Sequence, residues 1–554
     1  MLFGWTKLSH SRFPCSHSFK ITKKGAERLI VDAAVELAER GHDVRKRTDG
    51  EREREKKGFC FNVFQRLDDA PLKKNTSTST LTFSSPSRLS HEERERERER
   101  ERGSDRKAGL KYSKQPNSNR QVTIYTAHHD RSRAFAETVD GPFRVVVAGA
   151  WFPRSLARGR AIALCAYVRC VLAAIRIAWD GREEGKRWDA AVADQVSAAV
   201  PVLQLLLAPA AAVLFYCHFP DLLLAKPRPA GSFSAWLHAL YRRPLDAVEQ
   251  ASTGSADRIL VNSEFTAGVF ATTFPRLARR GVAPRVLYPA ASIPSDEALR
   301  GAREGWREAL PAEVVSLVEG GGGSKPAVFV SVNRFEGKKG LPLALRALGA
   351  LDELLLQQQV APKETGAPAA GEPKARAPPP PPVLVFAGGF DARLPENASV
   401  LLELQRLAAE LGLSSRVAFL PSFSDEQRGA LLAVATAVLY TPENEHFGIV
   451  PVEAAAAAVP VVACSSGGPK ESVMDGETGF LRRPEPVEFA RAMLELVRGE
   501  GGGGRAEAMG AAARRRAAEV FSRSAFGAEL EREVREMLQE KEEKKKSEKD
   551  KKRR

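Results

Sequence analysis

Residues 437–458 read AVLYTPENEHFGIVPVEAAAAA, and this stretch decides the fold class. It opens with an apolar run typical of a buried strand, passes through a polar loop, and continues into alanines that favour a helix. The same strand, loop and helix unit recurs through the second half of the chain. Its other strands are predicted in AVFVSVNRF (327–335), PVLVFAGG (382–389), RVAFLPS (416–422) and VPVVACSSGG (459–468). This alternation predicts an α/β domain whose parallel sheet is covered on both faces.

The first half of the chain shows the same alternation, which predicts a second domain of the same class. Its apolar runs are FRVVVAG (143–149), VLFYCHF (213–219), RILVNS (258–263) and RVLYP (285–289). The sequence EGGGGSK at 319–325 is expected to be a flexible joint between the two domains. Ligands of such sheets bind beyond the carboxyl ends of the strands, so we expect the site in a cleft between the domains.

Domain boundaries follow from these patterns. We expect an N-terminal Rossmann-like domain over residues 1–318 and a C-terminal one over 326–504. A C-terminal helix is expected over 505–540, and a charged tail over 541–554.

The positive charge of the chain is local. The formal net charge is +15, of which residues 45–120 contribute +8 and residues 541–554 contribute +5. Because nucleic-acid binding needs basic residues gathered on one folded face, no nucleic-acid partner is expected. Residues 45–120 also include ERERE and EERERERERER runs that cannot form a core. They are predicted to interrupt a strand that joins residue 43 to residue 122, either as a retained intron or as a disordered insertion.

Two carboxylates stand out in the opening stretch. Glu445 is predicted in a loop that follows a strand, and Glu453, eight residues later, in the first turn of a helix. A carboxylate accepts hydrogen bonds from sugar hydroxyls, and the free N–H groups of a helix start favour a phosphate. By spacing alone, both residues are equally well explained as ordinary acids at a helix N-terminus.

The residues around this pair resemble the E-x7-E element of retaining glycosyltransferases of family 4, which have the GT-B fold. Further blocks resemble the GDP-mannose-dependent alpha-1,3/1,6-mannosyltransferases that build the dolichol-linked oligosaccharide for N-glycosylation. These blocks are YTPENEHFGIVPVEA, ACSSGGPKES, SVNRFEGKK, FAGGFDARLPEN, FYCHFPDLLLA and YTAHHDRSRAFAET. The resemblance covers most of residues 25–44 and 122–530. It implies transfer of mannose from GDP-mannose to Man-GlcNAc2-PP-dolichol, with alpha-1,3 and then alpha-1,6 linkages.

The resemblance assigns roles to individual residues. The catalytic set that it implies is Glu445, His218, Lys339 and Arg334. The donor-binding set is Arg334, Lys339, Gly388, Glu445, Phe447, Gly448, Ile449 and Glu453. Gly467 and Gly468 are expected to let the backbone approach the ligand closely. The basic pair would hold the diphosphate, so neither a metal ion nor another cofactor is expected.

The acceptor side is expected in the first domain, at Gly25, His128 and His129. By composition the two histidines and Asp130 are also a candidate metal cluster, but adjacent side chains at a strand end point apart. The family has a glycine-rich loop before the first helix, and here only Gly25 remains, after Lys23 and Lys24. An inactive isoform that binds donor or acts as a scaffold is therefore an alternative, as is a GT-B enzyme that uses another sugar nucleotide.

A lipid-linked acceptor implies contact with the endoplasmic-reticulum membrane. Residues 159–179 are predicted to form an apolar helix, either at the membrane interface or buried in the first domain. Residues 196–217 carry no charge, but their prolines predict a helix, a turn and a buried strand. The N-terminus lacks the apolar core of a signal peptide, and the six cysteines are scattered. The expected location is therefore the cytosolic face of the endoplasmic-reticulum membrane. Other early mannosyltransferases of the pathway are candidate partners.

Overall fold

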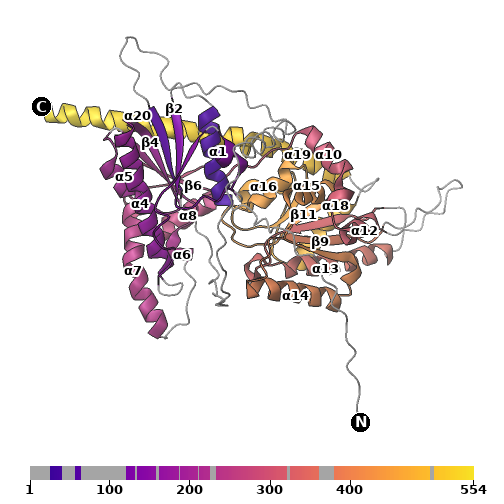
Figure 1. The fold of residues 1–554 in the computed structure, drawn as a ribbon. Coiled ribbons are helices and arrows are strands. Elements are labelled where there is room, and N and C mark those ends of the chain that lie inside the picture. Colours follow the sequence, from indigo (N-terminus) through magenta and orange to yellow (C-terminus); the bar gives the residue numbers. More distant parts are fainter. Residues whose placement is uncertain are drawn as a thin grey trace, which may run out of the picture.

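Two parallel sheets form the framework of the protein in the computed structural model, and each belongs to its own lobe (Figure 1). The structure describes residues 25–39, 57–63, 120–131, 134–141, 143–156, 161–185, 187–209, 211–224, 233–320, 325–360, 380–498 and 504–553. Both sheets are wound in the order expected of Rossmann-like domains. The predicted α/β class is therefore confirmed.

The first sheet has seven strands in the order β3-β2-β1-β4-β5-β6-β7. The strands are β1 (Lys57–Val63), β2 (Arg120–Thr126), β3 (Arg144–Val147), β4 (Arg187–Asp194), β5 (Ala212–Cys217), β6 (Arg258–Val261) and β7 (Arg285–Val286). Every residue of β5 is buried, because helices cover both faces of the sheet. The uncharged segment at 196–217 forms helix α5 and then β5, as predicted.

Strand β1 corrects the expectation for residues 45–120. It lies inside that segment, yet it pairs in parallel with β2 on one side and with β4 on the other. The sequence KGFCFNV is short, apolar and rich in aromatic residues, and such a sequence suits the centre of a sheet. Strand β2 begins at Arg120, so the chain enters this strand at its start. The proposed junction of residue 43 with residue 122 lies outside the described residues.

Helices pack on both faces of the first sheet. They are α1 (Gly25–Glu39), α3 (Ala136–Asp140), α4 (Ile162–Glu183), α5 (Ala199–Leu206), α6 (Asp221–Leu224), α7 (Phe233–Thr253), α8 (Glu264–Thr273) and α9 (Pro275–Arg279). Among the described residues, α4 is one helix long and apolar enough to cross a membrane, and half of its most apolar window is buried. Arg169 in α4 is buried and donates a hydrogen bond to the Ala127 carbonyl. Its guanidinium therefore does not extend to the solvent.

The second sheet has six strands in the order β10-β9-β8-β11-β12-β13. These strands are β8 (Val328–Val332), β9 (Val383–Gly388), β10 (Val417–Pro421), β11 (Ala437–Tyr440), β12 (Val461–Cys464) and β13 (Gly479–Arg482). Its later helices are α13 (Pro342–Val360), α14 (Pro395–Glu410), α15 (Asp425–Val434), α16 (Ile449–Ala456), α17 (Pro469–Ser472) and α18 (Pro486–Val497). The strands predicted from the apolar runs are all present.

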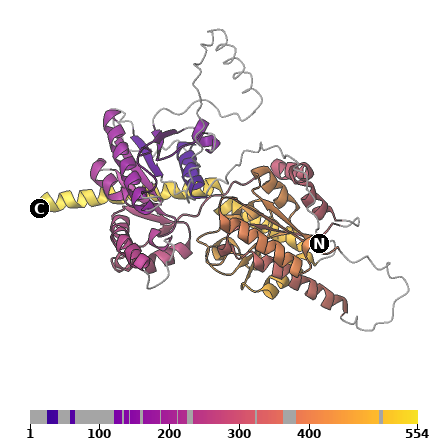
Figure 2. The ribbon, with the colours of Figure 1, turned by 60° about the horizontal axis from the view of Figure 1, so that its bottom comes forward.

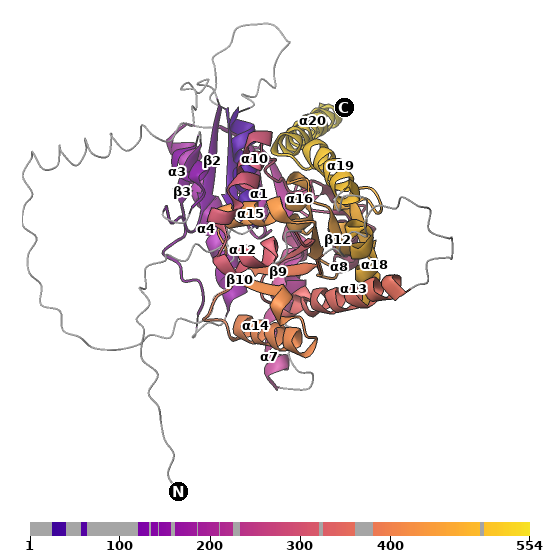
Figure 3. The ribbon, with the colours of Figure 1, turned by 90° about the vertical axis from the view of Figure 1, so that its right-hand side faces the viewer.

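Three helices before the glycine-rich joint belong to the second lobe rather than the first. They are α10 (Asp296–Glu304), α11 (Trp306–Ala309) and α12 (Ala312–Glu319). Helix α12 lies beside β9 and β10 (Figure 3). Trp306, Val314 and Val318 are buried in one apolar cluster with β8 and β9. Burial of these side chains draws the segment onto the second sheet, so the chain passes between lobes before α10 and not at the expected residue 318.

The C-terminus also differs from the expectation of one helix followed by a tail. Helix α19 (Gly504–Val520) packs on the second lobe, and α20 (Arg523–Arg553) runs back along the first lobe (Figures 1 and 2). Phe526, Leu530 and Val534 of α20 are buried in the same apolar cluster as α1. The helix continues through the Lys/Glu-rich segment, since these residues have good helix propensity.

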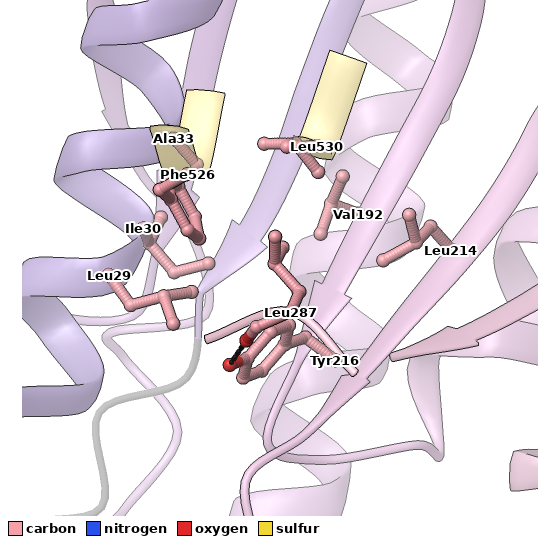
Figure 4. A pocket seen from close by; sticks show the side chains of 9 residues that line it. All are labelled: Leu29, Ile30, Ala33, Val192, Leu214, Tyr216, Leu287, Phe526 and Leu530. Atoms are coloured by element: carbon pink, nitrogen blue, oxygen red, sulfur yellow. Dashed lines mark hydrogen bonds between the residues drawn. The ribbon is translucent and has the colours of Figure 1, made fainter. Parts of the chain in front are cut away.

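A small pocket lies in this cluster, between α1, α20 and the first sheet (Figure 4). Its lining is apolar except for Tyr216, whose hydroxyl donates to the Leu287 carbonyl at 2.8 Å. A sugar nucleotide needs several polar partners, so this pocket is a packing defect of the core and not the functional site.

Candidate active site

The charged residues singled out in the sequence lie at the carboxyl ends of parallel strands in both lobes. His218 follows β5, Glu445 follows β11, and Lys339 ends the short 3-10 helix η1 (Gly337–Lys339) that follows β8. Ligands of doubly wound sheets bind at these strand ends. The structure therefore places these three residues where the fold predicts a site.

Lys339 and Glu445 form a direct ion pair, with 2.5 Å between Nζ and Oε2. Lys339 is buried, and its carbonyl accepts a hydrogen bond from the Thr441 hydroxyl, which fixes η1 against the loop after β11. Burial alone raises the pKa of Glu445, but the Lys339 ammonium outweighs it and brings the pKa below its ordinary value. The pair thus places a carboxylate, whose pKa is lowered, directly beside a lysine side chain.

Arg334 does not join this pair. Its guanidinium contacts Glu336 at 2.8 Å, and about half of its side chain is exposed. The predicted basic pair is therefore split into a buried, fixed Lys339 and an exposed Arg334 that is able to turn toward a ligand.

Glu453 lies one turn further into α16 than predicted, because the helix begins at Ile449 and has no acidic residue in its first turn. It also has a protein partner. Arg428 in α15 contacts its carboxylate at 2.8 Å and also pairs with Asp425. Burial raises the pKa of Glu453, and Arg428 counteracts this shift. Sequence reasoning missed Arg428, because the two residues are 25 positions apart and lie on different helices.

The predicted donor-site glycines are needed for close packing of the backbone. A Cβ at Gly388 would lie 1.7 Å from the Asn333 carbonyl oxygen, at the ends of β9 and β8. Gly448 has a φ of +77° and precedes α16, where Ile449 is the first helical residue. Gly467 and Gly468 lie against the backbone of residues 444–447 rather than against a free surface. These two glycines therefore support the Glu445 loop, and their expected role toward a ligand stays a prediction.

Phe447 is buried in an apolar cluster with Tyr288 and Phe521. Its ring anchors the loop between the lobes, so only its backbone is available to a donor. This orientation could not be predicted from the sequence, since an aromatic residue in a polar loop is compatible with burial or with exposure.

His446 joins the two lobes at the centre of the site. Its ring stacks on Phe219 with 3.6 Å between centroids, and its carbonyl accepts a hydrogen bond from the Ser263 hydroxyl at 2.5 Å. Burial lowers the pKa of His446 to about 4, so this imidazole is neutral at physiological pH. Residues 218–219 of the first lobe and 445–446 of the second are thereby held side by side.

His218 has a buried partner that sequence reasoning missed. Its Nε2 lies 2.7 Å from Oδ1 of Asp194, the last residue of β4. Burial raises the pKa of Asp194, while His218 counteracts the shift. The available signal was an acidic residue directly after the apolar run AAVA at 190–193. Its strand is the neighbour of β5, which precedes His218.

The acceptor-side residues form a looser group. His128 and His129 follow β2, where His128 is exposed and His129 contacts the Thr138 hydroxyl at 3.0 Å. Gly25 is the first residue of α1. Lys23 and Lys24 lie outside the described residues, and so does any loop that precedes this helix.

Comparison with known proteins identifies the class. Residues 319–516 match the sequence model of the family described as "Glycosyl transferases group 1". Sucrose-phosphate synthase from Thermosynechococcus elongatus shares the fold, with a TM-score of 0.51 at 18% identity over 76% of this chain and 90% of that one. The catalytic domain of starch synthase IV from Arabidopsis thaliana gives 0.51 at 14% identity, over 76% and 92%. The protein is a GT-B glycosyltransferase.

Curated relatives narrow this class to one family. The chain is 42% identical to "Alpha-1,3/1,6-mannosyltransferase ALG2" of Mus musculus over 410 residues, which covers 74% of this chain and 87% of the relative. The protein of the same name from Homo sapiens is 41% identical over 418 residues, with 75% and 89% covered. This chain therefore belongs to the alpha-1,3/1,6-mannosyltransferase family, and the resemblance seen in the sequence is confirmed.

Proposed function

We propose that the enzyme transfers mannose from GDP-mannose to Man-GlcNAc2-PP-dolichol, first in alpha-1,3 and then in alpha-1,6 linkage. The relatives' names support the two linkages. One observation carries the site assignment: the Lys339–Glu445 ion pair adjoins His446, which stacks on the residue after His218. A cation and a carboxylate from one lobe thus meet an imidazole from the other.

Each chemical group of the donor substrate GDP-mannose has a residue suited to bind it. Lys339 and a reoriented Arg334 hold the diphosphate, and the N-terminus of α16 with Gly448 and Ile449 adds backbone N–H groups. Gly388 shapes the neighbouring strand end, and Phe447 contributes backbone only. Glu445 accepts hydrogen bonds from mannose, Glu453 accepts them from ribose, and His218 contacts the sugar from the first lobe.

The reaction needs charge stabilisation at the leaving group. The acceptor hydroxyl oxygen forms a bond to the anomeric carbon as the bond from that carbon to the phosphate oxygen breaks. Attack on the same face retains the configuration, and the leaving phosphate oxygen takes the hydroxyl proton. Lys339 and Arg334 offset the charge that develops on GDP, so the reaction requires no metal ion.

The acceptor approaches through the first lobe, past Gly25, His128 and His129. Its lipid places the enzyme on the cytosolic face of the endoplasmic-reticulum membrane, beside other early mannosyltransferases of the pathway. Trp179 of α4 and Trp236 of α7 are each 58% exposed, and Leu240 of α7 is 55% exposed. Exposed tryptophans suit a membrane interface, so the exposed start of α7 is proposed to meet the lipid.

The test is a transfer assay with purified chain, Man-GlcNAc2-PP-dolichol and one sugar nucleotide at a time, with and without EDTA. We expect two successive additions from GDP-mannose, unaffected by EDTA. Linkage-specific mannosidases should identify the first product as alpha-1,3 and the second as alpha-1,6. Transfer from another sugar nucleotide, or no transfer at all, would reject the proposal, and activity restored by manganese after EDTA would reject its metal-free mechanism.

A further inference from the structure

Asp194 and His218 form a pair across two neighbouring strands of the first sheet. Asp194 lies opposite Tyr216 in the register of β4 and β5, and His218 follows two residues later. The Asp194 side chain is 1% exposed and the His218 side chain 19%. The imidazole therefore lies between a buried carboxylate and the interface where the lobes meet.

The backbone just after Asp194 is strained. Gln195 has a φ of +61°, a conformation that residues other than glycine rarely adopt. The turn is held by hydrogen bonds from Gln195 N to the Tyr216 carbonyl and from Val196 N to the Asp194 carbonyl. Such strain persists where the surrounding structure requires one orientation, and here it fixes the side chain that contacts His218.

Packing alone does not account for Asp194. Its Oδ2 is buried and has no hydrogen-bond partner among the described residues. A buried carboxylate with one partner is usually less stabilising than an apolar side chain of similar size. Asp194 is therefore better explained by its effect on His218 than by a contribution to the stability of the fold.

The chemistry of the pair determines the state of the imidazole. When the Asp194 carboxyl group is ionised it only accepts hydrogen bonds, and Nε2 of His218 then carries the proton of this contact. In the neutral ring the other nitrogen, Nδ1, is then an acceptor, and it has no partner within the described part of the protein. An acceptor nitrogen beside the Glu445 loop is suited to a sugar hydroxyl.

We propose that Asp194 is a positioning residue for mannose transfer: it holds the Nε2–H of His218 and thereby presents Nδ1 as a hydrogen-bond acceptor for a hydroxyl group of the sugar. This inference rests on the proposed function. Asp194 itself does not touch the substrate and acts only through His218.

A double-mutant cycle tests this dependence. Asp194→Leu removes the acceptor and should lower kcat/KM about 10- to 100-fold, as is typical when a partner that orients an active-site histidine is lost. Asp194→Asn keeps one acceptor oxygen and should lose less. In a His218→Ala background neither change should reduce transfer further, because the histidine they serve is gone. Equal losses in both backgrounds would overturn the proposal.

A matched control uses Asp180 of α4, another buried carboxylate of the same lobe, which accepts from the Tyr125 hydroxyl at 3.1 Å. Asp180→Leu should lower the melting temperature while kcat/KM of the folded enzyme stays unchanged. A loss of kcat/KM as large as that of Asp194→Leu would show that any buried acid in this lobe has the same effect, and would contradict the assignment.

A second measurement does not depend on mannose transfer. Nitrogen NMR of histidine-labelled protein reports the tautomer of His218, with His218→Ala providing the assignment. We expect the Nε2–H tautomer in the unmodified chain and a mixture in Asp194→Leu. The Nδ1–H tautomer in the unmodified chain would overturn the pairing. A chain that shows the expected tautomer but transfers no mannose would instead refute the proposed function, so the two failures are distinguishable.

Discussion

Lys339 and Glu445 are each other's counter-charge, and this makes their single replacements informative. Removal of one partner leaves the other buried without compensation, whereas an exposed charge in the same segment carries no such penalty. Lys338, next in the chain, is 67% exposed and contacts Glu336 at 3.3 Å. The two neighbouring lysines thus form a natural pair of variant and control.

Lys339→Met should lower kcat on the order of a hundredfold, because loss of one preorganised charge at a leaving group costs ~3 kcal/mol of transition-state stabilisation. Lys338→Met should change kcat less than about twofold. The measurement is steady-state transfer from GDP-mannose, with thermal unfolding to confirm that both variants fold. If the two replacements had equal effects, Lys339 would have no special role.

At the scale of elements, the apolar strands were predictable because burial on both faces leaves long apolar runs. The pairing of Glu445 with Lys339 was not predictable from spacing, because it depends on how β8 and β11 lie side by side. Asp194 and Arg428 were missed for the same reason. Strand β1 was missed because highly charged runs flank it.

The ends of strands β8 and β9 pack closely at Gly388, and replacement of this glycine tests the packing. Gly388→Ala would place a Cβ within 1.7 Å of the Asn333 carbonyl, so one strand end must move. We expect a loss of more than about 2 kcal/mol of stability and weaker donor binding.

Gly349→Ala in α13 is the control: nothing lies within 4 Å of its Cβ, and alanine should stabilise the helix by about 1 kcal/mol. Calorimetry measures the stability of both variants, and a GDP-binding assay measures their affinity for the donor nucleotide. An unchanged melting temperature for Gly388→Ala would contradict the packing.

The start of α6 depends on a buried acid in α7. Glu249 accepts hydrogen bonds from the backbone N–H groups of Asp221 and Leu222, at 2.6 and 3.0 Å. Burial, with Asp221 nearby, raises the pKa of Glu249 to about 7. Because the folded state then binds a proton more tightly than the unfolded state, stability is full below the ordinary pKa of 4.5 and falls as pH rises toward 7.

This shift predicts a pH-dependent loss of at most about 3 kcal/mol between pH 4.5 and 7. Glu249→Gln cannot titrate, so the fall in melting temperature over this range should be smaller in that variant. Melting curves at several pH values provide the comparison. Identical pH dependence in both proteins would show that Glu249 is not the responsible group.

At the scale of the whole molecule, α20 ties the C-terminus to the first lobe. Glu533 of α20 is buried and contacts Arg285 at 3.2 Å and Arg258 at 3.5 Å, beside the apolar contacts of Phe526 and Leu530. A chain that stops before Arg523 should expose this core face and aggregate. A chain that stops after Lys541 keeps all of these contacts and should melt as the full chain does. Gel filtration and calorimetry test both, and a soluble, equally stable shorter chain would refute the role of α20.

The proposed function requires that mannose is transferred at the site built around Glu445. The most direct test is transfer of labelled mannose from GDP-mannose to Man-GlcNAc2-PP-dolichol by the unmodified chain, by Glu445→Ala and by Glu443→Ala, an exposed acid two residues away. We predict that the unmodified chain and Glu443→Ala transfer mannose at similar rates. Glu445→Ala should be slower by on the order of a hundredfold and should melt at a somewhat lower temperature, because Lys339 loses its counter-charge, while still unfolding cooperatively. Near-normal transfer by Glu445→Ala, or none by the unmodified chain, would contradict the account.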